Sequence, residues 1–174
     1  MIPFLSFPNI RLLVRFTLGA LALAAVPTVS ADWQSDYSSL LSKYADASGV
    51  DYQAWHGNAA DRKVLATVVE AIGTESPSGS KDERLAWYLN AYNALILHKM
   101  LEKYPAENTN RLMRKLFFSR RSFQLSGKHS SFDDLEHGII RPMFQEPRIH
   151  FALNCASVSC PPSHGASVHR RNTR

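Results

Sequence analysis

The stretch Ser80–Tyr104, SKDERLAWYLNAYNALILHKMLEKY, predicts the longest helix of the chain. Ser80 and Glu83 have the spacing of a capping box, in which a serine and a glutamate three residues apart satisfy the free N–H groups of a first helical turn. Pro105 ends the pattern, because proline cannot continue a helix. Apolar residues recur every three to four positions, at Leu85, Tyr88, Leu89, Tyr92, Leu95, Ile96 and Met100. We therefore expect the helix Lys81–Tyr104 to form the core of the domain.

Two asparagines, Asn90 and Asn93, lie three residues apart in this helix and are near neighbours on its surface. Asparagine is a mediocre helix former, so a pair of them among bulky apolar residues needs an explanation. They could face a polar pocket and bind a ligand, or clamp a loop backbone. They could instead be exposed, or make buried structural hydrogen bonds. Buried amides usually brace backbone groups, which favours the structural bond.

Shorter amphipathic helices are predicted on both sides of this core helix. Apolar residues recur at helical spacing over Asp32–Tyr44 and over Asp61–Ile72, where Gly73 would provide the C-cap. A further helix is predicted over Phe132–Ile140, and Pro142 would mark its end.

The run Arg111–Arg121, RLMRKLFFSRR, is basic and interleaved with apolar residues. It could contact phosphate groups or a membrane surface. Alternatively, it is a solvated helix that buries Leu112, Leu116 and Phe117. The neutral charge balance of the surrounding domain favours the second interpretation.

The stretch Glu146–Pro162, EPRIHFALNCASVSCPP, contains both cysteines of the chain. Apolar and other residues alternate here with a period of two, which predicts a half-buried strand, Ile149–Leu153. The strand leads into a polar loop, Cys155–Cys160, which two prolines close. Together with short extended pieces at Gly49–Tyr52 and Phe123–Leu125, this pattern predicts a mainly helical α+β fold with a small β-sheet carrying the Ile149–Leu153 strand.

Residues 1–31 resemble an export signal. Arg11 and Arg15 precede an apolar segment at 16–27, and the small residues around Ala31 suit a signal peptidase. We expect cleavage there and a periplasmic or secreted protein, with an uncleaved membrane anchor as the alternative. No other apolar run approaches the about 18 residues that a membrane span needs, so we expect no transmembrane span after cleavage.

The charge balance argues against nucleic acid as a partner. The chain contains 20 lysines and arginines against 15 acidic residues. Five of the basic residues lie in the signal (Arg11, Arg15) or the terminal tail (Arg170, Arg171, Arg174), which leaves 15 against 15 for residues 32–169. A neutral domain has no general attraction for nucleic acid or anionic lipid.

Three segments together resemble the domain of unknown function 547 family (DUF547). They are WYLNAYNAL at 87–95; DLEH at 134–137 with Ile140–Arg141; and EPRIHFALNCAS at 146–157, followed by Ser159-Cys160-Pro161. The resemblance implies an exported bacterial member of a family that has no established activity, so it assigns no catalytic residue. Domains of this family are expected to continue beyond the Cys-Pro motif, which implies a truncated domain here.

The chain is thus divided into four parts. We expect a signal peptide at 1–31, an N-terminal helix of the mature protein at 32–49, an incomplete DUF547-like domain at 50–162 and a disordered basic tail at 163–174. The tail has no periodic apolar segment that could bury a face.

Three hypotheses remain for the chemistry of the cysteine-containing stretch. First, Cys155 and Cys160 form a disulfide, as the oxidising compartment favours, in a structural or binding module of the cell envelope. Second, Cys155 is the nucleophile of a thiol-dependent hydrolase or transferase, with His150 or His137 as its base and an asparagine orienting that base. Third, the two histidines and two cysteines bind zinc, although an oxidising compartment works against free thiolates.

We rank these hypotheses in that order and predict neither a metal nor a cofactor. The chain also has no glycine loop of the kind that cradles phosphate. The partner would be an unidentified small molecule or envelope protein. The candidate ligand-binding residues are Asn90, Asn93, Arg148 and Asn154.

Overall fold

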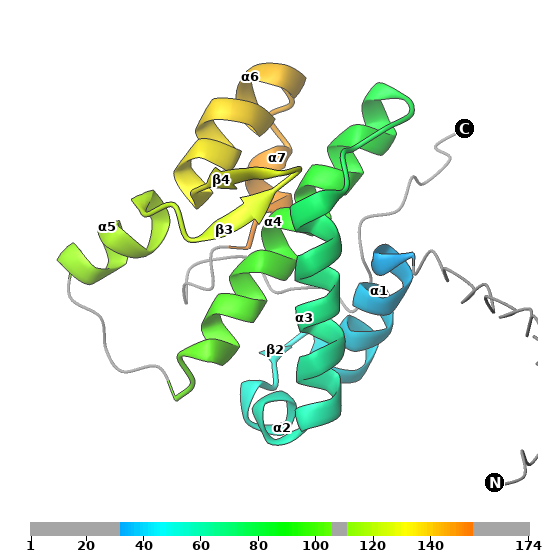
Figure 1. Ribbon diagram of the computed structural model, residues 1–174, viewed down its shortest axis with the longest axis vertical. Helices are drawn as coiled ribbons and strands as arrows, with labels where there is room; N and C mark the ends of the chain where they lie inside the picture. The colour runs from blue at the N-terminus through cyan, green and yellow to red at the C-terminus, as the bar shows by residue number, and fades with distance from the viewer. Residues whose placement is uncertain (1–31, 106–110, 155–174) are drawn as a thin grey trace, which may run out of the picture. The chain divides into compact units, whose positions relative to one another are not determined.

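Helix α4, Lys81–Glu102, begins at the predicted capping box. The Ser80 backbone N–H donates to Glu83 Oε2 at 2.7 Å, and the Glu83 N–H donates to Ser80 Oγ at 3.3 Å. The computed structural model describes residues 32–105 and 111–154, and α4 lies at the centre of this part (Figure 1). The predicted core helix is therefore confirmed, although it ends two residues before Tyr104.

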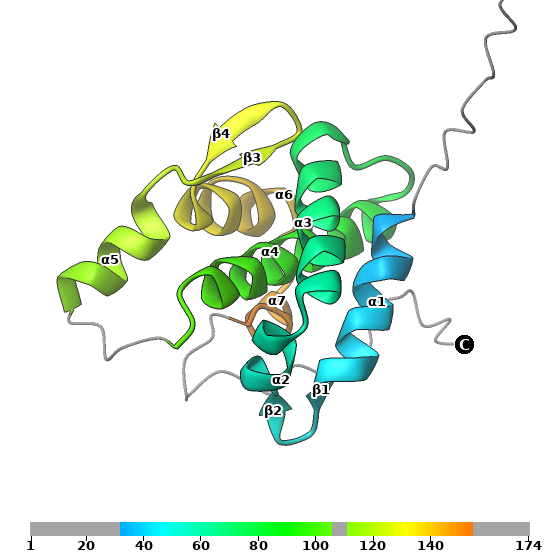
Figure 2. The same ribbon diagram turned by 60° about the horizontal axis from the view of Figure 1, so that its bottom comes forward.

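Helices α1, Trp33–Tyr44, and α3, Ala59–Thr74, pack against each other, and α3 also packs on α4 (Figures 1 and 2). The short helix α2, Tyr52–Gly57, joins them. Trp33 of α1 meets Trp87 of α4 edge to face, with ring centroids 5.6 Å apart. Both predicted amphipathic helices are confirmed.

The strands form two antiparallel hairpins. Strands β1, Ala45–Asp46, and β2, Gly49–Val50, make the first, and β3, Phe123–Leu125, and β4, Lys128–Ser130, make the second. Helices make up most of the described residues and each sheet has only two strands, so the predicted mainly helical α+β class is confirmed.

The second hairpin docks on the end of α3. Its turn residues Ser126 and Gly127 both have positive φ, and their N–H groups donate to Ile72 O at 3.1 Å and Gly73 O at 2.6 Å. Gly73 is not the predicted C-cap, because α3 continues to Thr74 and Glu75 is the cap. A Cβ at Gly73 would lie 3.1 Å from Gln124 Cβ, so the glycine permits the close approach of the hairpin.

The helix predicted at Phe132–Ile140 does not stop at Pro142. A wide π-helical segment, η1, runs over Asp134–Ile140, and α6, Arg141–Phe144, continues it directly. Pro142 lies at the junction, in the first turn of α6.

The predicted strand Ile149–Leu153 is wrong, because Ile149–Ala152 forms a single helical turn, α7. The Leu153 N–H donates to Ile149 O at 3.1 Å, and these two side chains are buried together. Phe151, which the alternation placed on the same face, is 73% exposed. Residues four apart share a face in a helix as they do in a strand, so the short pattern did not distinguish the two.

Helix α5, Arg111–Ser119, confirms the helix in the basic run but not its buried side. Leu112 and Leu116 were expected to be buried, yet they are exposed. Phe117 is partly buried and stacks on Phe132, with ring centroids 5.4 Å apart. Two aromatic residues, Phe117 and Phe118, thus take the place of the leucines in attaching α5 to the domain.

Other predictions fall outside the described residues. They are the signal peptide at 1–31, the cysteines with their proposed disulfide or zinc site, and the basic tail at 163–174. Within residues 32–105 and 111–154, no helix is long and apolar enough to cross a bilayer.

Phe132 joins three elements and should be the most sensitive core position of the second half of the domain. Its ring is 1% exposed and contacts Tyr92, Phe117, Phe118 and Phe123. We expect Phe132→Ala to lower the free energy of unfolding by about 3–5 kcal/mol, through lost burial and the cavity left behind. The matched control, Phe151→Ala, should change it by less than about 0.5 kcal/mol, because that ring is exposed. Urea denaturation measures both, and equal changes would contradict this assignment.

Candidate functional site

Consecutive residues of α4, Tyr92 and Asn93, hold two different segments of the chain. The Asn93 Nδ2 group donates to Ala152 O at 2.9 Å, and Asn93 Oδ1 accepts from the Asn154 backbone N–H at 2.9 Å. The amide therefore clamps the chain where it leaves α7, immediately before Cys155. Asn93 is half-buried, and both of its amide groups bond to backbone in the segment that leaves α7.

Tyr92 reaches the other segment, η1. Its hydroxyl donates to Glu136 Oε2 at 3.4 Å, and the phenol is almost fully buried. Burial, followed by the nearby Glu136 carboxylate, raises the pKa of Tyr92 well above its usual value. The phenol is thus a permanent donor to this carboxylate and not an acid–base group near neutral pH.

Arg141 fixes the opposite side of the same carboxylate. Its Nε and Nη2 donate to Glu136 Oε1 at 3.0 and 2.7 Å. These two residues are five apart, on opposite sides of an ordinary helix of 3.6 residues per turn. The wide turns of η1 bring them together, since π-helical bonds join residues five apart.

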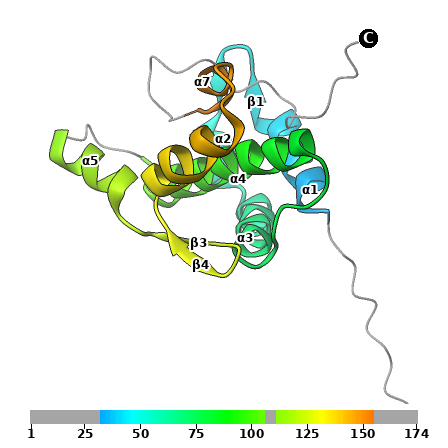
Figure 3. The same cartoon turned by 90° about the horizontal axis from the view of Figure 1, so that it is seen from above.

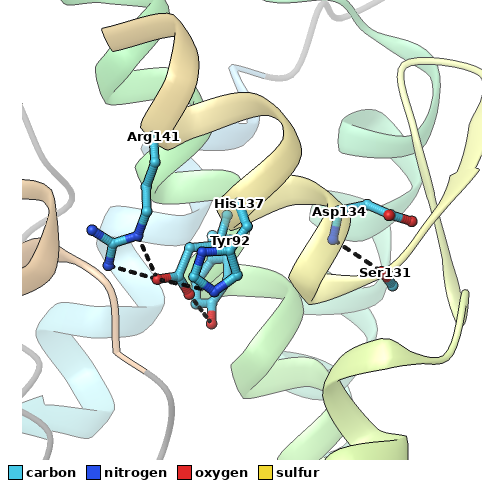
Figure 4. Close-up of polar contacts among 6 residues, drawn as sticks. Tyr92, Ser131, Asp134, His137 and Arg141 are labelled. Carbon is cyan, nitrogen blue, oxygen red and sulfur yellow. Dashed lines mark hydrogen bonds and ion pairs between the residues drawn. The ribbon is translucent and has the colours of Figure 1, made fainter. Parts of the chain in front are cut away.

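His137 lies beside this carboxylate and faces solvent. Its Nε2 is 4.0 Å from Glu136 Oε1, and its side chain is 63% exposed. Figure 4 shows Tyr92, His137 and Arg141 together, while Asp134, whose backbone N–H Ser131 Oγ caps at 3.0 Å, lies at the far end of the segment. An accessible imidazole next to a fixed carboxylate is an arrangement that suits a general base.

The other candidate residues are not gathered at this point. Asn90 is buried inside the domain, and His150 lies exposed on α7 with its ring near Phe151, at 5.6 Å between centroids. Arg148 is exposed and pairs with Glu146 of its own segment. Among the described residues, no group of three or more potential ligands could hold a metal ion.

Sequence analysis missed Tyr92, Glu136 and Arg141 as site residues. Tyr92 was assigned to the apolar stripe of its helix, and the other two occur in the DLEH and Ile140–Arg141 segment that contributed to the family resemblance. A signal was therefore present, but a spacing of five does not suggest a helical contact.

A pocket of about 480 Å³ lies elsewhere, between α3, α4 and the β3–β4 hairpin. Its lining includes Leu95, His98, Lys99 and Phe123, and none of the residues that hold Glu136 or clamp α7. Burial lowers the pKa of His98, so this imidazole is neutral at neutral pH. The pocket shares no side chain with the candidate site.

Residues 77–169 match the family described as "Protein of unknown function, DUF547". The chain belongs to this family. No curated protein and no solved structure matches it. All of the residues that hold Glu136 and clamp α7 lie inside the match, whereas α1, α2 and α3 precede it. The predicted domain began at residue 50 and ended at 162, so the DUF547 match starts later and continues further.

The hydrogen bonds from Asn93 to Ala152 and Asn154 should protect the Asn154 amide from hydrogen exchange. We expect Asn93→Ala to lower the free energy of unfolding by about 1–3 kcal/mol, since two partly buried hydrogen bonds are lost. Asn93→Asp keeps the acceptor for Asn154 N–H and loses the donor to Ala152 O. Amide hydrogen exchange should therefore show Asn154 deprotected in the alanine variant and partly protected in the aspartate variant.

The exposed residue Gln53 on α2 provides the matched control, as Gln53→Ala should leave this exchange unchanged. An Asn154 amide that exchanges equally fast in the wild type and in Asn93→Ala would contradict the clamp.

The ion pair between Glu146 and Arg148, in the connection between α6 and α7, should make the stability of the fold depend on pH. Hydrogen bonds from the Arg148 side chain and then its backbone N–H lower the pKa of Glu146 from 4.5 to about 2. Since the pKa is lower in the folded state, the pair stabilises the fold above pH 4.5 and loses this effect as the pH falls toward 2. An NMR titration of the Glu146 carboxyl measures this pKa. Arg148→Gln should raise it toward 4.5, and a wild-type value already at 4.5 would refute the pairing.

Proposed function

We propose that this DUF547 protein is a binding or structural module of the cell envelope, which presents a Cys155–Cys160 disulfide loop on a braced segment. The observation that carries the proposal is the Asn93 clamp on Ala152 and Asn154. The NH2 group and the oxygen of the Asn93 amide both bond to backbone groups, so this side chain holds the segment from Ala152 to Asn154 in place. A segment fixed at its entry lowers the ordering cost of binding through the loop that follows.

The exposed surface of α7 supports a binding role. Phe151 is 73% exposed, and His150 and Arg148 beside it are exposed too. Aromatic and arginine side chains supply much of the energy at binding surfaces. A small molecule or an envelope protein could therefore be held by α7 and the adjoining loop.

The envelope location is part of this proposal. It rests on the signal-like sequence at 1–31 and on the stability of disulfides in exported proteins.

The second candidate function is a thiol-dependent hydrolase or transferase, which the Glu136–His137 pair favours. In this scheme Cys155 attacks the acyl group of a substrate, and His137 accepts the thiol proton and passes it to the group that leaves as its bond to the acyl carbon breaks. Water or an acceptor then releases the acyl group from the sulfur, and Glu136 orients the imidazole. Arg141 and Tyr92 hold the carboxylate in place, as an orienting group requires. His150 is the alternative base, although the described residues give it no carboxylate contact.

Thiol labelling of the exported protein, followed by mass spectrometry, distinguishes the two functions. The chain has only two cysteines. For the binding module, we expect no alkylation before reduction and two alkylated cysteines after it. The enzyme requires a reduced thiol that labels rapidly near neutral pH.

Two variants make the labelling result decisive. If one thiol labels rapidly and His137→Gln slows it about tenfold or more, the enzyme replaces the binding module as the function. His129→Gln, at an exposed histidine of β4, is the matched control and should leave the rate unchanged.

A further inference from the structure

Helix α5 has an exposed apolar face in addition to the one that attaches it to the domain. Leu112, Met113 and Leu116 are 63%, 51% and 46% exposed, and we call these three residues the outer face of α5. Leu112 and Leu116 are one turn apart, so they lie on the same side of the helix. All three views show α5 at the edge of the domain (Figures 1, 2 and 3).

The outer face is not the side that packs. Phe117 and Phe118 attach α5 to the domain, with ring centroids 5.4 and 6.0 Å from that of Phe132. At 100° per residue, the direction midway between these aromatics lies about 140° from the centre of the outer face. A nine-residue helix therefore exposes apolar side chains on the side away from Phe132.

Clustering distinguishes this face from ordinary exposed apolar residues. Met143 and Phe151 are also exposed, but they lie singly on other elements. Isolated apolar residues are normal on protein surfaces, whereas contiguous ones mark a contact surface.

The charges around the outer face are basic. No acidic residue occurs between 111 and 121, and Lys115 and Arg120 are exposed. At 100° per residue, Arg120 lies about 35° and Lys115 about 105° from the centre of the outer face, whereas Arg114 lies about 150° away. Lys103 also lies away from the outer face, with its Nζ 5.0 Å from the Phe117 ring centroid. Asp134 forms an ion pair with Arg121, whose Nε lies 3.3 Å from Asp134 Oδ2. The local charge is thus positive, although residues 32–169 as a whole are neutral.

A second copy of the chain does not fit this face. Three side chains offer far less than the roughly 800 Å² per partner of a stable protein interface. Two α5 helices would also bring Lys115 and Arg120 of each copy near one another, and such like charges repel.

We propose that the outer face of α5 inserts into the surface of an anionic lipid bilayer. Leucine and methionine side chains would enter the boundary between headgroups and acyl chains, while Lys115 and Arg120 pair with lipid phosphates. The helix would lie in the interface and not cross it. This surface is separate from α7 and from the Glu136 network. The lipid-binding proposal therefore does not depend on which function those residues have.

Tryptophan fluorescence with the full chain tests the proposal. The natural Trp33, Trp55 and Trp87 are buried. A tryptophan introduced by Met113→Trp is therefore expected to give most of the fluorescence change that contact with lipid causes. We expect vesicles of brominated phosphatidylglycerol to quench and blue-shift its emission, and vesicles of brominated phosphatidylcholine to do so much less. Because the signal is local to α5, binding through residues 1–31 does not produce it.

Second-site variants in the Met113→Trp chain test each part of the mechanism. Leu112→Ser/Leu116→Ser should raise the lipid concentration for half-maximal quenching about tenfold or more, since two apolar side chains are lost. Lys115→Gln/Arg120→Gln should raise it about tenfold at low salt, and added salt should reproduce this effect.

Matched controls separate α5 from the rest of the surface. Met143 on α6 is 49% exposed, a fraction similar to that of Met113, but it lies outside the outer face of α5. Met143→Trp should therefore show little quenching. Arg62→Gln/Lys63→Gln removes an exposed basic pair from α3 and should change nothing. Thermal melts by circular dichroism verify that each variant is folded.

Three outcomes would overturn the proposal. They are equal quenching at positions 113 and 143, equal quenching by anionic and neutral vesicles, and an oligomer that Leu112→Ser/Leu116→Ser dissociates on size exclusion with light scattering. The last outcome would assign the outer face to a second copy of the chain.

Discussion

A polar side chain on a packed helix needs hydrogen-bonding partners, and on α4 this requirement connects distant parts of the chain. Asn93 satisfies its amide with backbone groups about 60 residues later, and the neighbouring Tyr92 satisfies its hydroxyl with Glu136. An unsatisfied buried polar group costs about 1–3 kcal/mol, which favours the contact of the buried Tyr92, while the half-buried Asn93 gains two hydrogen bonds. The positions of η1 and of the segment before Cys155 thus depend on two adjacent residues of one helix.

The two contacts have different consequences for chemistry. The Asn93 contact is between neutral groups and fixes only the path of the backbone. The Glu136 contact holds a charge in place, since Arg141 offsets the carboxylate and Tyr92 donates to it. A carboxylate held in this way can influence the exposed His137 beside it. The backbone brace supports a binding module, and the charged network supports the enzyme alternative.

Local features of the sequence predicted much of the fold. The capping box of α4, the periods of α1 and α3 and the β3 strand depend on residues close in sequence, and they occur where expected. The errors arose where distant contacts decide. Alternation over Ile149–Leu153 fits a strand and a helical turn equally well, and the clamp from α4 supplies the missing information. The buried side of α5 was assigned to leucines, although aromatic packing on Phe132 determines it.

The site was predictable in kind but not in its contacts. Asparagine within a helix indicated a backbone brace, yet nothing in the sequence identifies Ala152 and Asn154 as its partners. The Glu136–Arg141 pair depends on the wide turns of η1, and the five-residue spacing conceals it from any search based on ordinary helices.

The packing of α1 and α3 has a practical consequence for defining this domain. The family match begins at residue 77, after both helices, yet Trp33 packs on Trp87 and α3 packs on α4. A recombinant fragment cut at the family boundary would remove the apolar cover of its own central helix and expose that surface to water. Helices outside the family match therefore cover the helix at its centre, and expression of the domain should begin near Asp32.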